Sequence, residues 1–353
     1  MKICTIFTGG TIGSEFSDNG YISADEGKKY QLIELYQKRY KNDHEFVSRS
    51  PYYMLSENLD AKHINLLIRE IELAIMVGTY DCILVMHGTD TLCYTASALS
   101  LLFDDSDIPI ILVSADHPLS DERSNGLDNF ANAIGFAEFV MADRAKAGGL
   151  SKQDQKAHRG VFVSYVNSEL RGAVPGIHKG QYVLEQQFMS SAVNSIDEMF
   201  YGEFETDGID GAEFGKFRQN PHYKDTFICH TISDLRRRMS KEADEFEGFY
   251  LPETCPVLRI FAYPGIIYPP CPPDIKYVLI KGYHSGTLCC DEALEAFCAR
   301  CRMKGITVYI AGLREGESAY ESTQKYEEFG IKPLFNMTDI CAFMFLWFSS
   351  GLD

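Results

Sequence analysis

Two short turns near the N-terminus combine glycine with hydroxyl side chains, and each follows an apolar run. They are Thr8-Gly9-Gly10-Thr11 and His87-Gly88-Thr89-Asp90-Thr91. Paired glycines let the backbone approach a ligand closely, free amides can bind an oxyanion, and a threonine hydroxyl can act as a nucleophile. The two turns together favour acyl-transfer chemistry. Alone, the first turn could be an ordinary glycine-rich turn or a weak phosphate loop, and the second could be the capped start of a helix, with Asp90 accepting from its first amides.

The elements predicted around these turns place both at the carboxyl ends of strands. Short β-branched runs alternate with longer segments of helical period, which is typical of a mainly parallel sheet covered by helices. In such open sheets, ligands bind at the carboxyl ends of the strands. The strands expected in this part are residues 2–7, 82–86, 110–113 and 161–166, and the helices are residues 28–40, 61–77, 91–102 and 125–140.

A second, smaller βα series begins near residue 257. Its expected strands are residues 257–262, 277–280 and 307–311, and its helices are residues 291–303 and 339–348. The expected class is therefore α/β, with a larger N-terminal, doubly wound, mainly parallel sheet domain and a smaller C-terminal α/β domain. We expect the domains at residues 1–190 and 257–353. Residues 191–256 are expected to form a linker with some structure, including a strand at 227–229 and a helix at 232–245.

Composition excludes several classes of partner. The 353 residues include 33 Lys and Arg against 50 Asp and Glu, a formal charge of −17, which argues against nucleic acid or an anionic membrane surface as partner. We find no apolar run of about 18 residues that could span a membrane. The apolar run before the first glycine turn is too short for a signal peptide, so we expect a cytoplasmic protein.

The 11 cysteines are odd in number and widely spread, which indicates reduced thiols rather than a disulfide framework. Cys298 and Cys301 are three apart on an expected helix. A zinc site would need a second ligand pair at defined spacing, so packed thiols are favoured and no metal is expected.

Together the two turns resemble the motifs of the bacterial-type L-asparaginase family, which carries TGGTI at the N-terminus and HGTDT about 80 residues later. The resemblance is supported by Ser56-Glu57-Asn58-Leu59, by Val113-Ser114-Ala115 and by the segment that opens at Asn125. In the late half, Ala262-Tyr263-Pro264-Gly265-Ile266 is similar to the cytosolic, type I branch.

The resemblance implies a threonine-dependent amidohydrolase. Thr11 would attack the side-chain amide carbon of L-asparagine, release ammonia and form an acyl-enzyme that water hydrolyses to L-aspartate. Tyr21 would contact this nucleophile. Thr89, Asp90 and a lysine would form a second catalytic group. His87 is structural in the family and is not expected to be catalytic.

The resemblance also implies the substrate-binding residues. Asp90 would hold the α-ammonium group of the substrate and Ser56 its α-carboxylate, while Glu57 would help recognise the amino group. Gly10, Gly88 and Ala115 would complete the substrate site. The family implies no metal or organic cofactor, and it implies a homo-oligomer, either a dimer or a tetramer.

The catalytic lysine is where this sequence departs from the family pattern. The family places it five residues after the glycine of a segment that resembles Leu170-Arg171-Gly172, and here that position is Ile177. The nearest lysine is Lys179, which requires a two-residue insertion. Lys179 is therefore the expected catalytic lysine.

Three alternatives remain open on the same fold. The protein could be a glutaminase-asparaginase, because one extra methylene changes discrimination by only about 1–3 kcal/mol. It could be the amidase component of a tRNA-dependent amidotransferase, although that component normally carries an extra N-terminal domain. It could also be a non-catalytic asparagine sensor, which the shifted lysine favours and the intact Thr11, Tyr21, Thr89 and Asp90 oppose.

Overall fold

The computed structural model divides the chain into two compact units, Met1–Asp225 and Thr226–Asp353. The structure describes these residues: 1–16, 22–24, 30–146, 158–166, 176–183, 200–204, 217–223, 250–283, 285–313, 315–316 and 320–351. The strand expected at 227–229 and the helix expected at 232–245 lie outside this set.

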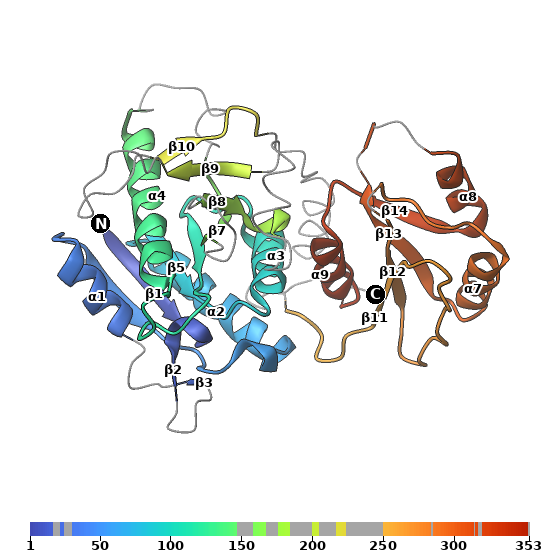
Figure 1. The fold of residues 1–353 in the computed structure, drawn as a ribbon, viewed down its shortest axis with the longest axis horizontal. Coiled ribbons are helices and arrows are strands. Elements are labelled where there is room, and N and C mark those ends of the chain that lie inside the picture. Colours follow the sequence, from blue (N-terminus) through green and yellow to red (C-terminus); the bar gives the residue numbers. More distant parts are fainter. Residues whose placement is uncertain are drawn as a thin grey trace. The chain divides into compact units, whose positions relative to one another are not determined.

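The first unit is built on an eight-stranded sheet with the order β10-β9-β8-β7-β6-β5-β1-β4 (Figure 1). The strands from β4 to β7 are parallel, and β8, β9 and β10 continue the sheet antiparallel. The strands are β1 (Lys2–Phe7), β4 (Glu45–Arg49), β5 (Cys82–Met86), β6 (Ile110–Val113), β7 (Val161–Tyr165), β8 (Gly176–Lys179), β9 (Phe200–Phe204) and β10 (Phe217–Gln219).

Helices cover both faces of this sheet. The apolar residues of α1 (Gln31–Arg39) and α4 (Gly126–Lys146) join one core with alternate residues of β5 and β6, while α2 (Ala61–Val77) and α3 (Leu92–Phe103) pack together on the other face. Asp60 caps α2 by accepting a hydrogen bond from the backbone N–H of His63, and Gly78 ends it in a left-handed conformation. The expected doubly wound, mainly parallel sheet is confirmed.

Short elements complete the first unit. A two-stranded antiparallel ribbon is formed by β2 (Ser14–Phe16) and β3 (Ile22–Ala24). Among the described residues there are also the short 3₁₀ helices η1 (Thr11–Gly13), η3 (Ser56–Asn58) and η5 (Gly180–Tyr182).

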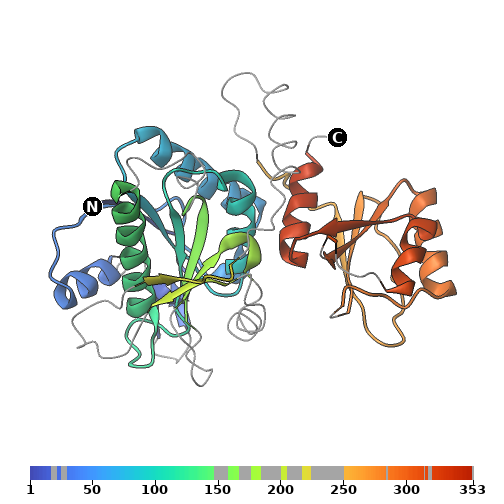
Figure 2. The same cartoon turned by 90° about the horizontal axis from the view of Figure 1, so that it is seen from above.

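The second unit has its own four-stranded, fully parallel sheet with the order β11-β12-β13-β14. Helices α7 and α8 lie on one side of it and α9 on the other (Figure 2). Its elements are β11 (Val257–Phe261), β12 (Tyr277–Lys281), α7 (Glu292–Met303), β13 (Thr307–Leu313), α8 (Glu321–Phe329), β14 (Ile331–Phe335) and α9 (Asp339–Ser349).

The boundary expected near residue 190 needs correction. Strands β9 and β10 lie beyond it, yet both extend the first sheet. Part of the segment expected to be a linker therefore belongs to the first unit. Within the described residues, none of the helices is long and apolar enough to cross a membrane.

Candidate active site

The candidate site lies at the carboxyl ends of β1 and β5. These strands are parallel neighbours, and their last residues, Phe7 and Met86, are in register. The chain leaves β1 towards β4 on one side and later continues from β5 towards β6 on the other, so the strand order reverses between them. Such a switch point is where open α/β sheets bind ligands.

Hydrogen bonds fix the first turn to the end of β5 and to the segment around Met54. The Thr8 hydroxyl donates to the carbonyl of Met86 (2.8 Å), and the amide of Gly10 donates to the carbonyl of Met54 (2.8 Å). Gly9 and Gly10 both have positive φ, 100° and 77°. Since an L side chain rarely adopts this conformation, the turn requires glycine at both positions.

Gly10, Gly88 and Ser56 bring three separate segments into direct contact. A Cβ atom on Gly10 would lie 2.2 Å from the Cα of Gly88, and a Cβ on Gly88 would lie 2.3 Å from the Oγ of Ser56. Only glycine allows this approach. The resemblance that selected Gly10, Gly88 and Ser56 thus selected residues that the fold packs against one another.

Thr11, the expected nucleophile, opens η1 directly after Gly10 and is half-buried. The first amides of a helix have no partner within it, so they remain available to a ligand. The turn is anchored beyond Thr11, because the Ser14 hydroxyl donates to the carbonyl of Gly10 (2.6 Å) and the Tyr53 hydroxyl to that of Gly13 (2.7 Å).

His87 is fixed as a neutral ring beneath the second turn. Its Nδ1 donates to the carbonyl of Gly88 (2.8 Å), so its Nε2 must accept from the Thr95 hydroxyl (2.9 Å). Burial lowers the pKa of His87 to about 4. Both ring nitrogens are occupied by structural bonds, which leaves His87 no free nitrogen to act as a base.

The remaining expected site residues, from the second turn and from η3, differ in exposure to solvent. Thr89 and Ser56 are buried, whereas Asp90 and Glu57 are exposed. The second turn is joined to η3, because the Thr91 hydroxyl donates to the carbonyl of Ser56 (3.0 Å). Asp90 and Glu57 are thus accessible to solvent next to the buried Thr89 and Ser56.

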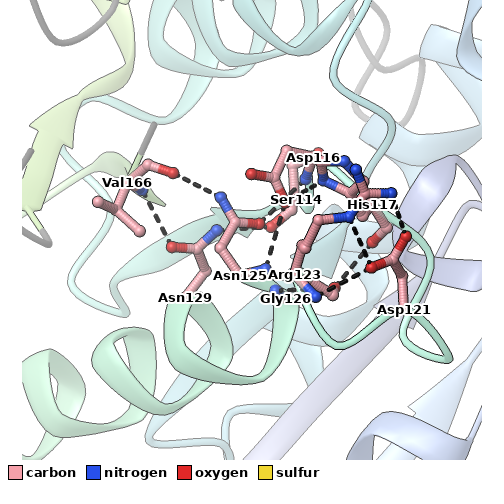
Figure 3. A network of polar contacts seen from close by, with 10 residues as sticks. Ser114, Asp116, His117, Asp121, Arg123, Asn125, Gly126, Asn129 and Val166 are labelled. Carbon is pink, nitrogen blue, oxygen red and sulfur yellow. Dashed lines mark hydrogen bonds and ion pairs between the residues drawn. The ribbon is translucent and has the colours of Figure 1, made fainter. Parts of the chain in front are cut away.

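A third strand end contributes Ala115, which follows β6 and is fully buried. Two asparagines of the α4 N-terminal region hold its neighbours (Figure 3). The side chain of Asn129 donates to the carbonyl of Ser114 (2.8 Å) and accepts from the amide of Val166 (3.0 Å). Asn125 accepts from the amide of Asp116 (3.0 Å) and donates to the carbonyl of Val166.

Lys179 requires a correction, because the structure does not bring it to this edge. It lies on β8, which runs antiparallel to β7, and it stands opposite Phe162 near the amino end of β7. Its Nζ donates to the carbonyl of Arg159 and lies 4.4 Å from the ring centre of Phe162. At about 3.3 Å per residue, three positions separate it by about 10 Å from the strand end at Tyr165.

The antiparallel reversal explains this difference. Counting along the sequence assumes that the chain stays at the carboxyl edge after β7. On β8 each further residue moves away from that edge, and the family's position, Ile177, is a buried strand residue opposite Ser164. Tyr21 lies outside the described residues.

Sequence reasoning did not assign a role to Asn125 and Asn129, although it noted the segment. The signal that could have found them is a pair of amides four residues apart at the start of a helix, directly after a buried strand end. As for a cofactor, the described residues contain no group of three His, Cys, Asp or Glu side chains that could hold a metal ion.

The fold and the candidate site define an α/β protein with glycine- and hydroxyl-rich turns at a switch point. The model of the family "Asparaginase, N-terminal" matches residues 2–188, just over half of the chain. The chain belongs to the asparaginase family. This membership supports an amidohydrolase enzyme.

Curated relatives match only part of the chain. L-asparaginase 1 of Escherichia coli (strain K12) is 31% identical over 133 residues, which cover 38% of this chain and 39% of that protein. A component of the glutamyl-tRNA(Gln) amidotransferase of Methanosarcina barkeri is 31% identical over 182 residues, 50% of this chain and 42% of that protein. The chain therefore spans less than half the length of these relatives.

Solved structures match the fold over almost the whole chain. The thermostable L-asparaginase from Thermococcus kodakarensis superimposes with a TM-score of 0.64 at 20% identity, covering 99% of this chain and 93% of that one. L-asparaginase I from Vibrio cholerae gives 0.61 at 20% identity, covering 99% and 92%. These likenesses extend the shared fold to the second unit.

Proposed function

We propose that this protein hydrolyses L-asparagine to L-aspartate and ammonia, with Thr11 as the nucleophile. The observation that carries the proposal is the contact of the TGGT and HGTDT turns at the carboxyl ends of β1 and β5, made through Gly10 and Gly88. The contact brings Thr11, which follows Gly10, and Thr89, which follows Gly88, to the same edge of the sheet.

In the proposed reaction, the Thr11 hydroxyl adds to the side-chain amide carbon of the substrate. Backbone amides beside Thr11 and Thr89 stabilise the oxyanion, and ammonia leaves to give an ester on Thr11. Water then hydrolyses the ester. Thr89 and Asp90 assist activation of the attacking hydroxyl or water, and Tyr21 contacts the nucleophile.

The substrate contacts follow from the same arrangement. Asp90 binds the α-ammonium group, Ser56 the α-carboxylate, and Glu57 the amino group from the exposed side. Gly10, Gly88 and Ala115 provide close backbone contacts. The site uses no metal or organic cofactor, and Lys179 has no part in it.

We further propose a cytoplasmic homo-oligomer, either a dimer or a tetramer. The ten cysteines that the structure describes are free thiols, which agrees with a reducing compartment. Light scattering coupled to size exclusion tests the oligomer, and a monomer over the working concentration range would refute it.

A second candidate function is supported by the similarity to the glutamyl-tRNA(Gln) amidotransferase component. That role would supply ammonia for the amidation of glutamyl-tRNA(Gln). The formal charge of −17 argues against direct binding of tRNA by this chain. Hydrolysis of glutamine alone would therefore point to an amidase that works with a basic partner protein.

The test is ammonia release from L-asparagine, L-glutamine and D-asparagine in parallel, with Thr11→Ala and Thr91→Ser as matched variants. We expect release from L-asparagine, a loss of at least about 100-fold in Thr11→Ala, and near-normal turnover in Thr91→Ser, which keeps the hydroxyl bonded to Ser56. No release from any of the three by a folded, oligomeric protein would reject the enzyme and favour the sensor.

A further inference from the structure

Two thiols in the second unit lie against each other although they are 30 residues apart. The Sγ atoms of Cys271 and Cys301 are 3.6 Å apart, and both residues are free cysteines. A disulfide requires sulfurs about 2 Å apart, so a movement of about 1.6 Å would allow the bond. Among the described residues, the pair is not part of a group of three or more His, Cys, Asp or Glu side chains.

The loop that carries Cys271 is restricted by its prolines and held near α7 at two points. Cys271 lies in Pro269-Pro270-Cys271-Pro272-Pro273, and each proline fixes its own φ angle. Before the loop, the ring of Tyr268 stacks on Phe297 of α7 with centres 4.8 Å apart and planes 21° apart. The carbonyl of Cys271 accepts from the Nζ of Lys304 (3.1 Å), just after α7. The two thiols are thus held together by contacts independent of the sulfurs.

The two cysteines differ in their access to solvent, which sets an order of reaction. Cys301 is fully buried on the inner face of α7, whereas Cys271 is half-buried. Burial, with smaller contributions from Cys271 and Cys298, raises the pKa of the Cys301 thiol to about 12. Because the thiolate is the reactive form, Cys271 is the thiol that meets an oxidant first.

We propose that Cys271 and Cys301 form a reversible disulfide site, with hydrogen peroxide as the oxidant. The Cys271 thiolate attacks one peroxide oxygen, the O–O bond breaks, and Cys271 becomes a sulfenic acid with release of hydroxide. The Cys301 sulfur then attacks the Cys271 sulfur, the S–O bond breaks, and water leaves with the Cys301 proton. Overall, two thiols and one peroxide give one disulfide and two waters.

The bond would join the proline loop covalently to α7 inside the second unit. It closes a loop of about 30 residues, and such closure stabilises a fold mainly by restricting the unfolded chain. We therefore expect oxidation to raise the thermal midpoint of the second unit by several degrees, and a thiol reductant to reverse the change.

Trypsin digestion separates the relevant cysteines cleanly. Cleavage after Arg259, Lys276, Lys281, Arg300 and Arg302 places Cys271 alone in peptide 260–276 and Cys301 alone in peptide 301–302, while Cys298 shares peptide 282–300 with Cys289 and Cys290. Full-length protein is treated with peroxide, its remaining thiols are blocked, and it is digested without reductant. Mass spectrometry then identifies the disulfide-linked peptides by their masses.

The expected product is peptide 260–276 linked to peptide 301–302. It should be absent from Cys271→Ser and Cys301→Ala, and retained in Cys298→Ser, a matched control one turn away on the same helix. Cys271 is only half-buried, so Cys271→Ser should still fold. The test therefore remains decisive if Cys301→Ala fails to fold. Linkage of peptide 260–276 to peptide 282–300, linkage only between protein molecules, or oxidation of other cysteines while this pair stays reduced would overturn the proposal.

Discussion

At the scale of single residues, Lys179 shows how one side chain can match a motif by type and still miss it by position. Its amine is buried against Phe162 and bonds the backbone of Arg159. A buried cation with these contacts supports the fold locally. We therefore expect its role to be structural, although the sequence distance to Gly172 differs from the family's by only two residues.

We predict that Lys179→Ala lowers stability rather than turnover. The change removes a buried stem and leaves the Arg159 carbonyl without this donor, which should cost about 2–4 kcal/mol of unfolding free energy. Ammonia release per folded molecule should stay within about two-fold, since Lys179 lies about 10 Å from the strand end. Urea unfolding and initial rates measure the two effects separately.

Lys179→Met is the control for this prediction, because it keeps the aliphatic length and removes the charge. It should recover part of the stability lost in the alanine variant. A fall in turnover of about 100-fold in both variants, with unfolding unchanged, would restore Lys179 to the catalytic group and contradict its placement on β8.

At the scale of elements, the start of α4 connects two strand ends at the site. Asn129 is fully buried and bonds both Ser114, after β6, and Val166, after β7. The backbone carbonyl of Asn129 also accepts from the Ser164 hydroxyl (2.7 Å). One helical turn therefore fixes the spacing of two strands where Ala115 would meet a substrate.

We predict that Asn129→Ala destabilises the protein by about 2–4 kcal/mol, because it leaves a buried carbonyl and a buried amide unpaired. Asn129→Asp should also destabilise, since a carboxylate cannot donate to the Ser114 carbonyl. The KM for the amide substrate should rise in whichever variant folds. Urea unfolding and steady-state kinetics measure these effects.

Asn132→Ala provides the matched comparison, since Asn132 is half-buried on the same helix one turn further on. It should change stability by no more than about 0.5 kcal/mol. Equal effects at positions 129 and 132 would mean that the loss reflects helix propensity rather than the link between the strands.

The elements also show what sequence can and cannot predict. Strands β1, β5 and β6 and helix α2 were predicted with the bounds that the structure gives, because long apolar runs and clear periodicity determine them. Strands β8, β9 and β10 were missed as members of the sheet. They are short and carry glycine or charge, and their antiparallel pairing depends on contacts distant in sequence.

The same distinction between local sequence and contacts distant in sequence applies to the candidate site. Its two turns could be predicted because each lies directly after a strong strand, and local sequence fixes both the strand and the turn. The position of Lys179 could not be predicted, since it depends on the direction of β8. Strand β14 was also missed, because Pro333 argues against a strand and is tolerated here on an edge strand.

At the scale of the whole molecule, buried histidines of the first unit connect its stability to pH, and two of them, His87 and His178, are the most strongly shifted. Burial lowers the pKa values of His87 and His178 to about 4. In the unfolded chain each ring takes up a proton near pH 6.5, while the folded ring stays neutral down to about pH 4. Between these values the unfolded state binds more protons, so acid weakens the fold.

We predict that the unfolding free energy of the first unit falls as pH drops from 6.5 to 4, by up to about 2.7 kcal/mol per pH unit for the two rings. Carboxylates titrate in the same range, so the histidine contribution is taken from the difference between wild type and His87→Gln. That variant should lose up to about 1.4 kcal/mol per pH unit of the slope, because glutamine does not titrate. Its amide can still donate to Gly88 and accept from Thr95, so the fold should be kept. Urea unfolding followed by circular dichroism from pH 7 to pH 4.5 measures it.

The second unit provides an internal comparison for this prediction. Trp347 is the only tryptophan of the chain, and its indole N–H donates to the carbonyl of Pro252 (3.0 Å) within the second unit. Its fluorescence should therefore follow the second unit, and the midpoint that it reports should not share the slope caused by His87. A slope that disappears from both signals in His87→Gln would mean that the two units unfold as one cooperative body, whereas an unchanged slope in both would show that His87 does not couple the fold to pH.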